Sequence, residues 1–245
     1  MKQIVLAVFA LALTGSSPTL AQQFVGTIEF VPGACPSGDQ LKLKYDFGYV
    51  DSHGVGWQTI AGDCTDGASI PNWAKPFIGG SFDPQFISAA VIHDHYCDRH
   101  VRTWRDTHWM FYDALLAGGV PEAKAKVMYY GVLIGGPKWI TLIEGEPCKV
   151  GSMCVEAANV STKIPNATIV KAESGDLVAA RPAQYSRPDI NAELKEVEDL
   201  LAQPGANVSL ADLEARAKAR NPDDFFLHNG DSIRYQGPRS AFPSK

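Results

Sequence analysis

The sequence predicts an α+β protein in which a small antiparallel sheet is followed by a helical pair or three-helix unit and by a mixed or irregular C-terminal accessory region. Two patterns support this fold class. Residues 24–31 and 41–50 alternate apolar with polar side chains, which is typical of half-buried strands. Two later stretches, 83–99 and 103–117, repeat apolar side chains at every third or fourth position, which indicates amphipathic helices with one inward face.

Turn residues separate the expected strands. A Pro-Gly pair at residues 32–33 and a Ser-His-Gly sequence at residues 52–54 are both typical of turns. Residues 57–61 are expected to form a third strand, which leads into a loop that begins at Cys64.

Three helices are expected in succession after this loop. The first begins near Asp83, which would cap it ahead of Pro84, and runs to residue 97 or 99. The second covers residues 103–117 and stops at a glycine pair, and the third covers residues 121–135.

The N-terminus is typical of a secretory signal peptide. Lys2 supplies a positive charge, residues 4–13 form a short apolar core, and Ala21 ends a small-residue cleavage site, so residues 1–21 are expected to be removed. The apolar core is shorter than the roughly 20 residues that a bilayer crossing needs, and no later stretch is long and apolar enough. We therefore expect a secreted or periplasmic bacterial protein, with an N-terminal membrane anchor as the alternative.

The mature chain is expected to divide into two parts. Residues 22–145 contain the sheet and the three helices. Residues 146–245 are expected to form an accessory region that is partly helical and partly disordered, because much of it lacks periodicity. Within it, residues 191–201 and 209–220 are predicted as charged surface helices, residues 156–187 show little periodicity, and the tail from residue 221 is predicted to be irregular. No cluster typical of a site is found there.

The cysteines are expected to form disulfide bonds, because an exported protein meets an oxidising environment. There are five, so one thiol must remain free, bind a ligand or pair with another chain. Cys148 and Cys154 are the natural local pair. Cys64 can pair either with Cys97 or with Cys35, and the sequence leaves this choice open.

The charge distribution excludes some classes of partner. The formal net charge is −5, with acidic and basic residues interspersed. No basic patch suited to nucleic acid and no polybasic run suited to anionic lipid is present. The remaining partners are a small-molecule, lipid or cell-envelope substrate, and the sequence does not determine the oligomeric state.

The densest group of reactive side chains lies between residues 64 and 115, which contain four of the six histidines. Helical spacing places His93 in the middle of the inward face of the first helix, with Asp94 at the edge of that face. On the second helix the same spacing places His108, and not Asp106, on the inward face. We therefore predict that His93 and His108 face each other, with Asp94 alongside and the Asp66 loop in reach.

These residues allow a functional and a structural interpretation. As a site, they would be catalytic and metal-binding; as structure, they would form a buried hydrogen-bond network in a non-enzymatic envelope or cell-surface interaction protein. His95 and His100 fit exposed or local capping positions better than a site. Cys97 lies on the same face as His93 and would be a candidate nucleophile if it were unpaired.

The motifs in this stretch resemble those of the bacterial and phage family called domain of unknown function 1353. The resemblance rests on residues 65–71 (TDGASIP), on His93-Asp94 followed by Tyr96, and on a polar residue, here His108, three positions before a phenylalanine. It covers about residues 24–139. Many members of the family carry Asp where this chain has His108. The family has no established activity, so the resemblance implies a domain boundary more than a function.

A second resemblance is to secreted phospholipases of the A2 type, which also combine a Gly-rich loop, a His-Asp helix with a nearby Tyr, and a facing helix. It implies that His93 is a general base and that Asp94 is a calcium ligand together with loop carbonyls near Asp66. The facing residue in that family is an aspartate, and His108 cannot serve as its anionic equivalent.

The facing histidine suits a different metal. His93 and His108 with Asp94 or Asp66 form a nitrogen-and-oxygen set that fits zinc and leaves room for a water. We therefore predict a metal-assisted hydrolase acting on an ester or cell-envelope substrate, with His93, Asp94 and His108 as catalytic residues. These three and Asp66 are the candidate metal ligands, and calcium or zinc is the candidate cofactor.

Overall fold

The structure is a computed structural model that describes residues 22–33, 41–65, 83–145, 154–156 and 164–236. The predicted signal peptide and the loop that carries Asp66 lie outside these residues, as do the side chains of residues 154–156. Antiparallel sheets and helices both occur in the described part, and the predicted α+β class is confirmed. Among the described helices, none has the length and apolarity that a membrane crossing requires.

The N-terminal strands form two small antiparallel sheets. One sheet has the order β1-β4-β5 and the other has the order β2-β3-β6. Their bounds are Gln23–Val25 (β1), Phe30–Pro32 (β2), Leu41–Leu43 (β3), Phe47–Val50 (β4), Gly56–Thr59 (β5) and Cys64–Thr65 (β6). The two longer strands predicted from the sequence are therefore each divided in two. Gly26, between β1 and β2, has a φ of +94°, which glycine adopts readily and which breaks the extended chain.

Three helices follow, close to the predicted bounds: α2 (Ile87–Arg99), α3 (Trp104–Ala117) and α4 (Glu122–Gly135). Asp83 does not cap α2 directly, because Phe86 is the N-cap residue. The Asp83 carboxylate instead accepts the Gln85 amide at 2.9 Å, one turn ahead of the helix. Thr103 caps α3 by accepting the Asp106 amide at 3.0 Å.

The C-terminal half contributes most of a five-stranded mixed sheet with the order β8-β11-β7-β10-β9. Its strands are Lys138–Glu144 (β7), Cys154–Glu156 (β8), Thr168–Lys171 (β9), Leu177–Arg181 (β10) and Ser232–Gln236 (β11). The expectation of an irregular tail is wrong for β11, which pairs in parallel with both β7 and β8. Strand β10 is buried along most of its length, so it lacks the alternation by which half-buried strands are predicted.

Two of the three C-terminal helices match the prediction: α6 (Ile190–Leu201) and α7 (Leu210–Arg220), followed by the short α8 (Phe225–His228). Ser209 and Asp212 form a reciprocal capping box at the start of α7.

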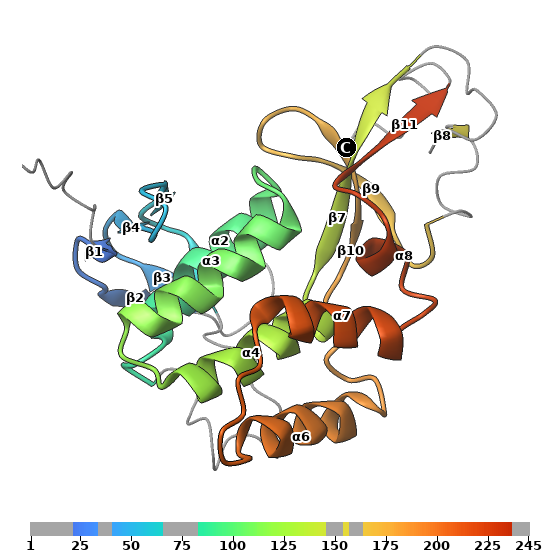
Figure 1. Cartoon of the computed structure of the whole chain (residues 1–245). Helices are drawn as coiled ribbons and strands as arrows, with labels where there is room; N and C mark the ends of the chain where they lie inside the picture. Colours follow the sequence, from blue (N-terminus) through green and yellow to red (C-terminus); the bar gives the residue numbers. More distant parts are fainter. Residues whose placement is uncertain (1–21, 34–40, 66–82, 146–153, 157–163, 237–245) are drawn as a thin grey trace, which may run out of the picture.

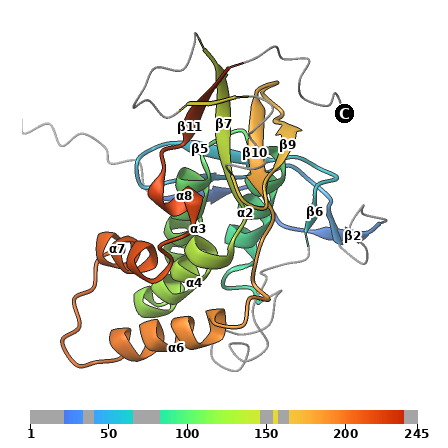
Figure 2. The same ribbon diagram turned by 90° about the vertical axis from the view of Figure 1, so that its right-hand side faces the viewer.

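Helix α4 packs against α3 on one side and against α6 and α7 on the other (Figure 1). Figure 2 shows the five-stranded sheet beyond one end of these helices. One continuous apolar core extends from Leu43 to Tyr235, and strands from both sides of the predicted boundary at residue 145 share a sheet.

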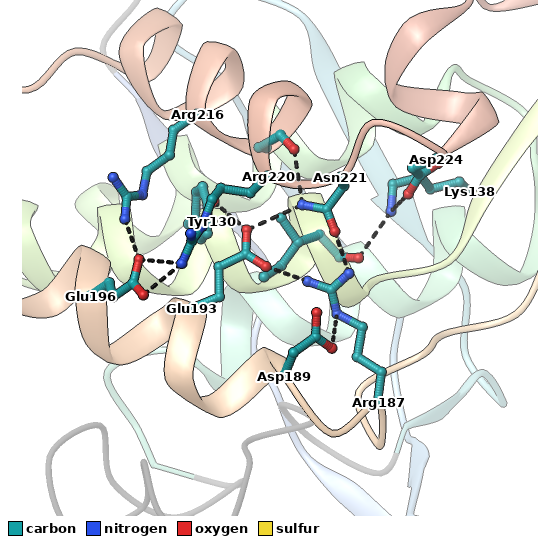
Figure 3. A network of polar contacts seen from close by, with 12 residues as sticks. Tyr130, Lys138, Arg187, Asp189, Glu193, Glu196, Arg216, Arg220, Asn221 and Asp224 are labelled. Atoms are coloured by element: carbon teal, nitrogen blue, oxygen red, sulfur yellow. Dashed lines mark hydrogen bonds and ion pairs between the residues drawn. The ribbon is translucent and has the colours of Figure 1, made fainter.

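A polar network joins α4, α6 and α7 (Figure 3). The Glu193 carboxylate is 4% exposed, and it accepts hydrogen bonds from the Tyr130 hydroxyl at 2.5 Å, the Arg187 guanidinium at 2.5 Å and the Asn221 amide at 3.1 Å. A buried carboxylate needs partners for its oxygens, and these come from three separate parts of the chain, so the contacts fix how the helices pack.

A second buried charge lies at the start of β7. Lys138 is fully buried, and its ammonium lies 3.6 Å from the Asp224 carboxylate, which also accepts a hydrogen bond from Arg181 at 2.7 Å. Burial lowers the pKa of Lys138 to about 7, although the negative charge of Asp224 opposes this shift.

The N-terminal sheet is connected to α3 by Asp113, which is 4% exposed. Its carboxylate accepts the Tyr49 hydroxyl at 2.6 Å, the Ser52 amide at 2.9 Å and the side-chain amide of Gln22 at 2.5 Å. These contacts join α3 to β4 and to the first residues of the described chain.

Lys138 is expected to make stability depend on pH above neutrality. Its folded-state pKa is about 7 and its ordinary value is 10.5, so the unfolded chain binds more protons between these values. The free energy of unfolding therefore rises with pH across this window, by at most about 1.4 kcal/mol per pH unit, and falls again as the pH is lowered toward 7. Lys138→Met should flatten this dependence in urea unfolding measured at several pH values between the two.

The matched control is Lys218→Met, at an exposed lysine of α7, which should follow the pH dependence of the wild type. A Lys138→Met variant with the full wild-type slope would show that Lys138 is charged in the folded protein.

Candidate functional site

The candidate site lies where α2 packs against α3. The two helices are joined by residues 100–103, and His100 ends α2 with a φ of +53° while its amide donates to the Tyr96 carbonyl. Thr103 then starts α3 through its capping hydrogen bond. This short connection makes α2 and α3 direct neighbours, so the middle of α2 meets the first half of α3 (Figure 1).

His93 and His108 meet at this interface. The two rings share a hydrogen bond in which His93 Nε2 and His108 Nδ1 lie 2.8 Å apart. His93 is 6% exposed and His108 is fully buried. The predicted placement of the two histidines on facing inward surfaces is confirmed, while their chemical roles remain predictions.

Cys97 lies one turn after His93 and completes a group of three. Its Sγ lies 3.5 Å from Nε2 and 3.8 Å from Nδ1 of His93, and one donor atom from each of Cys97, His93 and His108 lies within 4.8 Å of the others. Cys97 is a buried free thiol, so a bridge between Cys64 and Cys97 is wrong. Cys35 and Cys148 and the side chain of Cys154 lie outside the described residues. Burial raises the pKa of the Cys97 thiol, and the charges of Asp94 and Asp98 raise it further.

Asp94 lies at the more exposed end of the site. One carboxylate oxygen lies 3.9 Å from His93 Nδ1, and the other accepts a hydrogen bond from the Thr65 hydroxyl at 2.6 Å. The side chain is 25% exposed, so a solvent-side molecule can reach it. The Thr65 contact joins α2 to β6, directly before the loop that carries Asp66.

The second ring nitrogen of His108 faces the backbone that follows α4. His108 Nε2 is buried and has no partner with hydrogen-bond geometry in the described part of the chain, but the nearby Pro137 carbonyl raises the pKa of the ring. Burial has the larger effect and, with His93 and Lys138, holds the pKa of His108 well below its ordinary value. His108 is therefore neutral, so one of its ring nitrogens carries a proton and the other can accept a hydrogen bond.

Aromatic rings and one glycine enclose the histidine pair. The Phe111 ring lies 4.8 Å from that of His93, and the Trp104 ring lies 5.5 Å from that of His108, measured between centroids. A Cβ atom on Gly136 would lie 3.0 Å from His108 Nε2 and 2.4 Å from the Val132 carbonyl oxygen. The 2.4 Å contact is closer than real Cβ atoms come, and the 3.0 Å contact is tighter than nine in ten of them, so glycine is what lets this backbone approach the ring.

The other histidine of α2 belongs to a separate group. His95 Nδ1 lies 2.5 Å from the Asp63 carboxylate, which Arg99 also contacts at 2.7 Å, and Arg99 in turn binds Glu173. The His95 side chain is 9% exposed, so the expectation of an exposed position is wrong. Although burial opposes it, the hydrogen bond from His95 lowers the pKa of Asp63 to about 2. The i,i+4 spacing of His95 and Arg99, which places both side chains on one side of α2, was the signal in the sequence for this pair of basic residues.

Gly136→Ala should destabilise the protein and displace His108. The added methyl group has no space beside the Val132 carbonyl and the His108 ring, and overpacking of this kind costs about 1–3 kcal/mol. Gly56→Ala is the matched control, because a Cβ at Gly56 has no atom within 4 Å. Urea unfolding of both variants gives the comparison, and equal stabilities would contradict the close approach at Gly136.

Comparisons with known proteins place the chain in a family. A family model described as "Protein of unknown function (DUF1353)" matches residues 41–132. The chain is 41% identical over 183 residues to the uncharacterized protein y4iH of Sinorhizobium fredii (strain NBRC 101917 / NGR234), across 74% of this chain and 71% of the relative. It is 32% identical over 216 residues to the uncharacterized protein y4jT of the same organism, across 83% of this chain and 64% of that relative. No solved structure gives a significant match. The resemblance predicted from the motifs is confirmed, and the chain belongs to the DUF1353 family.

Proposed function

We propose that this protein is an exported, metal-assisted hydrolase of an ester or cell-envelope substrate, with its centre at His93, His108 and Asp94. The observation that carries the proposal is the 2.8 Å contact between His93 Nε2 and His108 Nδ1 in a buried interface with Asp94 beside it. Two imidazoles and a carboxylate are the groups that hydrolases use to hold a metal and to move a proton.

Each residue has a distinct part in this proposal. A bound divalent metal would lower the pKa of water and polarise a carbonyl. His108 stays neutral at physiological pH because it is buried, so its Nδ1 can act as a ligand or as a hydrogen-bond acceptor. Asp94 lies 3.9 Å from His93 Nδ1 and, as the most exposed member, would accept a proton from an attacking water.

The calcium arrangement implied by the phospholipase resemblance has less support. It makes Asp94 a calcium ligand together with carbonyls from the Asp66 loop, which lies outside the described residues. It also needs an anionic partner for His93, and the partner found here is the neutral His108. The nitrogen-rich arrangement therefore explains more of the observed contacts.

One observation favours the alternative of a non-enzymatic envelope or cell-surface protein. His108 is fully buried, His93 is 6% exposed and Cys97 is 8% exposed, which is also what a structural hydrogen-bond network requires. In that case only Asp94 would meet solvent, and the cluster would hold α2 against α3 without acting on a substrate.

Export is part of the proposal and is supported by a contact at the expected cleavage point. Gln22, the first residue after the predicted site, donates its side-chain amide to Asp113 at 2.5 Å. A chain cut after Ala21 therefore retains a specific contact at its new N-terminus.

His93→Gln should abolish hydrolysis and leave the fold intact. Glutamine keeps a polar group at this buried position but cannot replace the imidazole nitrogen as a metal ligand. The measurement is turnover of short-chain lipid esters and of peptidoglycan fragments by the full mature chain, before and after chelation and with metal returned.

Two results decide between the interpretations. His228→Gln, the same change at an exposed histidine near the C-terminus, should keep wild-type turnover. If wild-type protein hydrolyses none of these substrates, or if His93→Gln retains full activity, the hydrolase proposal fails. If His93→Gln loses both turnover and the folded circular dichroism spectrum, the cluster is structural.

Ala21→Phe should block removal of the N-terminal segment, because the residue before the cut must be small. N-terminal sequencing of the protein from the periplasm or medium should find Gln22 first in the wild type, and the variant should remain full length. Full-length wild-type protein in the cytoplasm would contradict export.

A further inference from the structure

We infer that His93, Cys97 and His108 form a thiolate-containing transition-metal centre of the zinc class. Cys97 is the new member, and its sulfur decides the metal. The inference shares its residues with the proposed function, but it concerns which ion binds and stands whether or not the protein hydrolyses a substrate.

Two of the three separations between the donor atoms are near those of a tetrahedral site, and the third, between Cys97 and His108, lies within 4.8 Å. Bond lengths of about 2.0 Å to nitrogen and about 2.3 Å to sulfur imply a nitrogen–sulfur separation of roughly 3.5 Å and a nitrogen–nitrogen separation of roughly 3.3 Å. Cys97 Sγ lies 3.5 Å from His93 Nε2, and the two ring nitrogens lie 2.8 Å apart. The nitrogen–sulfur separation already fits, and the histidines need to separate by about 0.5 Å.

The outer nitrogen of His93 supports the same conclusion. His93 Nδ1 lies 3.9 Å from the Asp94 carboxylate, while His108 Nε2 lies beside the backbone at Gly136 and has no hydrogen-bond partner among the described residues. Metal-bound histidines usually direct their second N–H at a carboxylate or a backbone carbonyl. The 2.8 Å contact between the two inner nitrogens is a hydrogen bond when no metal is bound, and a cation between them would take the place of its proton.

Cys97 would bind the ion as a thiolate. A divalent ion forms a bond to sulfur as the S–H bond breaks, and the proton is released to solvent.

The donor set selects among metals. Calcium and magnesium take oxygen ligands, whereas one thiolate and two imidazoles suit zinc and its substitute cobalt. Three protein ligands leave a fourth position on a tetrahedral ion, as in catalytic zinc sites. Asp94 is the partly exposed residue beside this group and marks the side from which a water or substrate reaches it.

The test is a cobalt titration of the metal-stripped, full-length mature protein. We expect one cobalt per chain, the intense visible bands of a tetrahedral ion, and a near-ultraviolet thiolate charge-transfer band. Zinc should displace the cobalt, and a large excess of calcium should not.

Matched variants assign the ligands. Cys97→Ser should lose the charge-transfer band while keeping a folded circular dichroism spectrum, and His108→Gln should lose the tetrahedral bands. Asp94→Asn should retain the spectrum and bind about 10- to 100-fold more weakly, because it removes an outer partner and not a ligand. His95→Gln, on the same helix but bound to Asp63, should match the wild type.

Two outcomes overturn the inference: a wild-type protein that binds no cobalt, or a Cys97→Ser variant with an unchanged charge-transfer band. Either result leaves the three residues as a hydrogen-bond network. Cobalt binding without turnover would support the metal centre and refute the hydrolase. Calcium-dependent turnover without cobalt binding would support the hydrolase and refute the thiolate-containing metal centre.

Discussion

The hydrogen bond between His93 and His108 satisfies two imidazoles in an interface from which water is excluded. Both rings are buried, so each needs polar partners, and each ring supplies one for the other. This requirement fixes the rotation of α2 relative to α3, because a small turn of either helix would separate the nitrogens. The positions of Cys97 and Asp94 follow from it, since both lie on α2 within one turn of His93.

The requirement that buried polar groups have polar partners also applies elsewhere in the molecule. Asp113 joins α3 to the N-terminal sheet, and Glu193 joins α4 to α6 and α7. Asp224, between Arg181 and Lys138, connects the helical layer to the five-stranded sheet. Each of these groups is charged or polar and largely buried, and each finds its partners on distant parts of the chain. A buried charge without such partners would cost several kcal/mol, so these contacts select one packing of the layers.

The site combines features of a reactive centre and of a closed core. Its nitrogens and sulfur lie within 4.8 Å of one another, while the Trp104 and Phe111 rings pack against the two histidines and Asp94 beside them is 25% exposed. Membership of the DUF1353 family supports the treatment of the His93-Asp94 pair and His108 as one unit, but the family carries no activity that would assign a substrate. Determining which metal ion the site binds is therefore the most direct way to learn which reaction it could catalyse.

By itself, the sequence determined the α+β class, the three central helices and the facing positions of His93 and His108. It could do so because helical periodicity is local, and a few residues of spacing decide which side chains share a face. Only the tertiary structure decided the five-stranded sheet, the partners of Asp113 and His95, and the free thiol of Cys97 beside the histidines. Strand β11 pairs with β7 across about 90 residues of chain, and no local pattern encodes such a pairing. The place of Cys97 in the site could not be predicted either. Whether a cysteine forms a disulfide or lies beside two imidazoles depends on which distant segment packs against it.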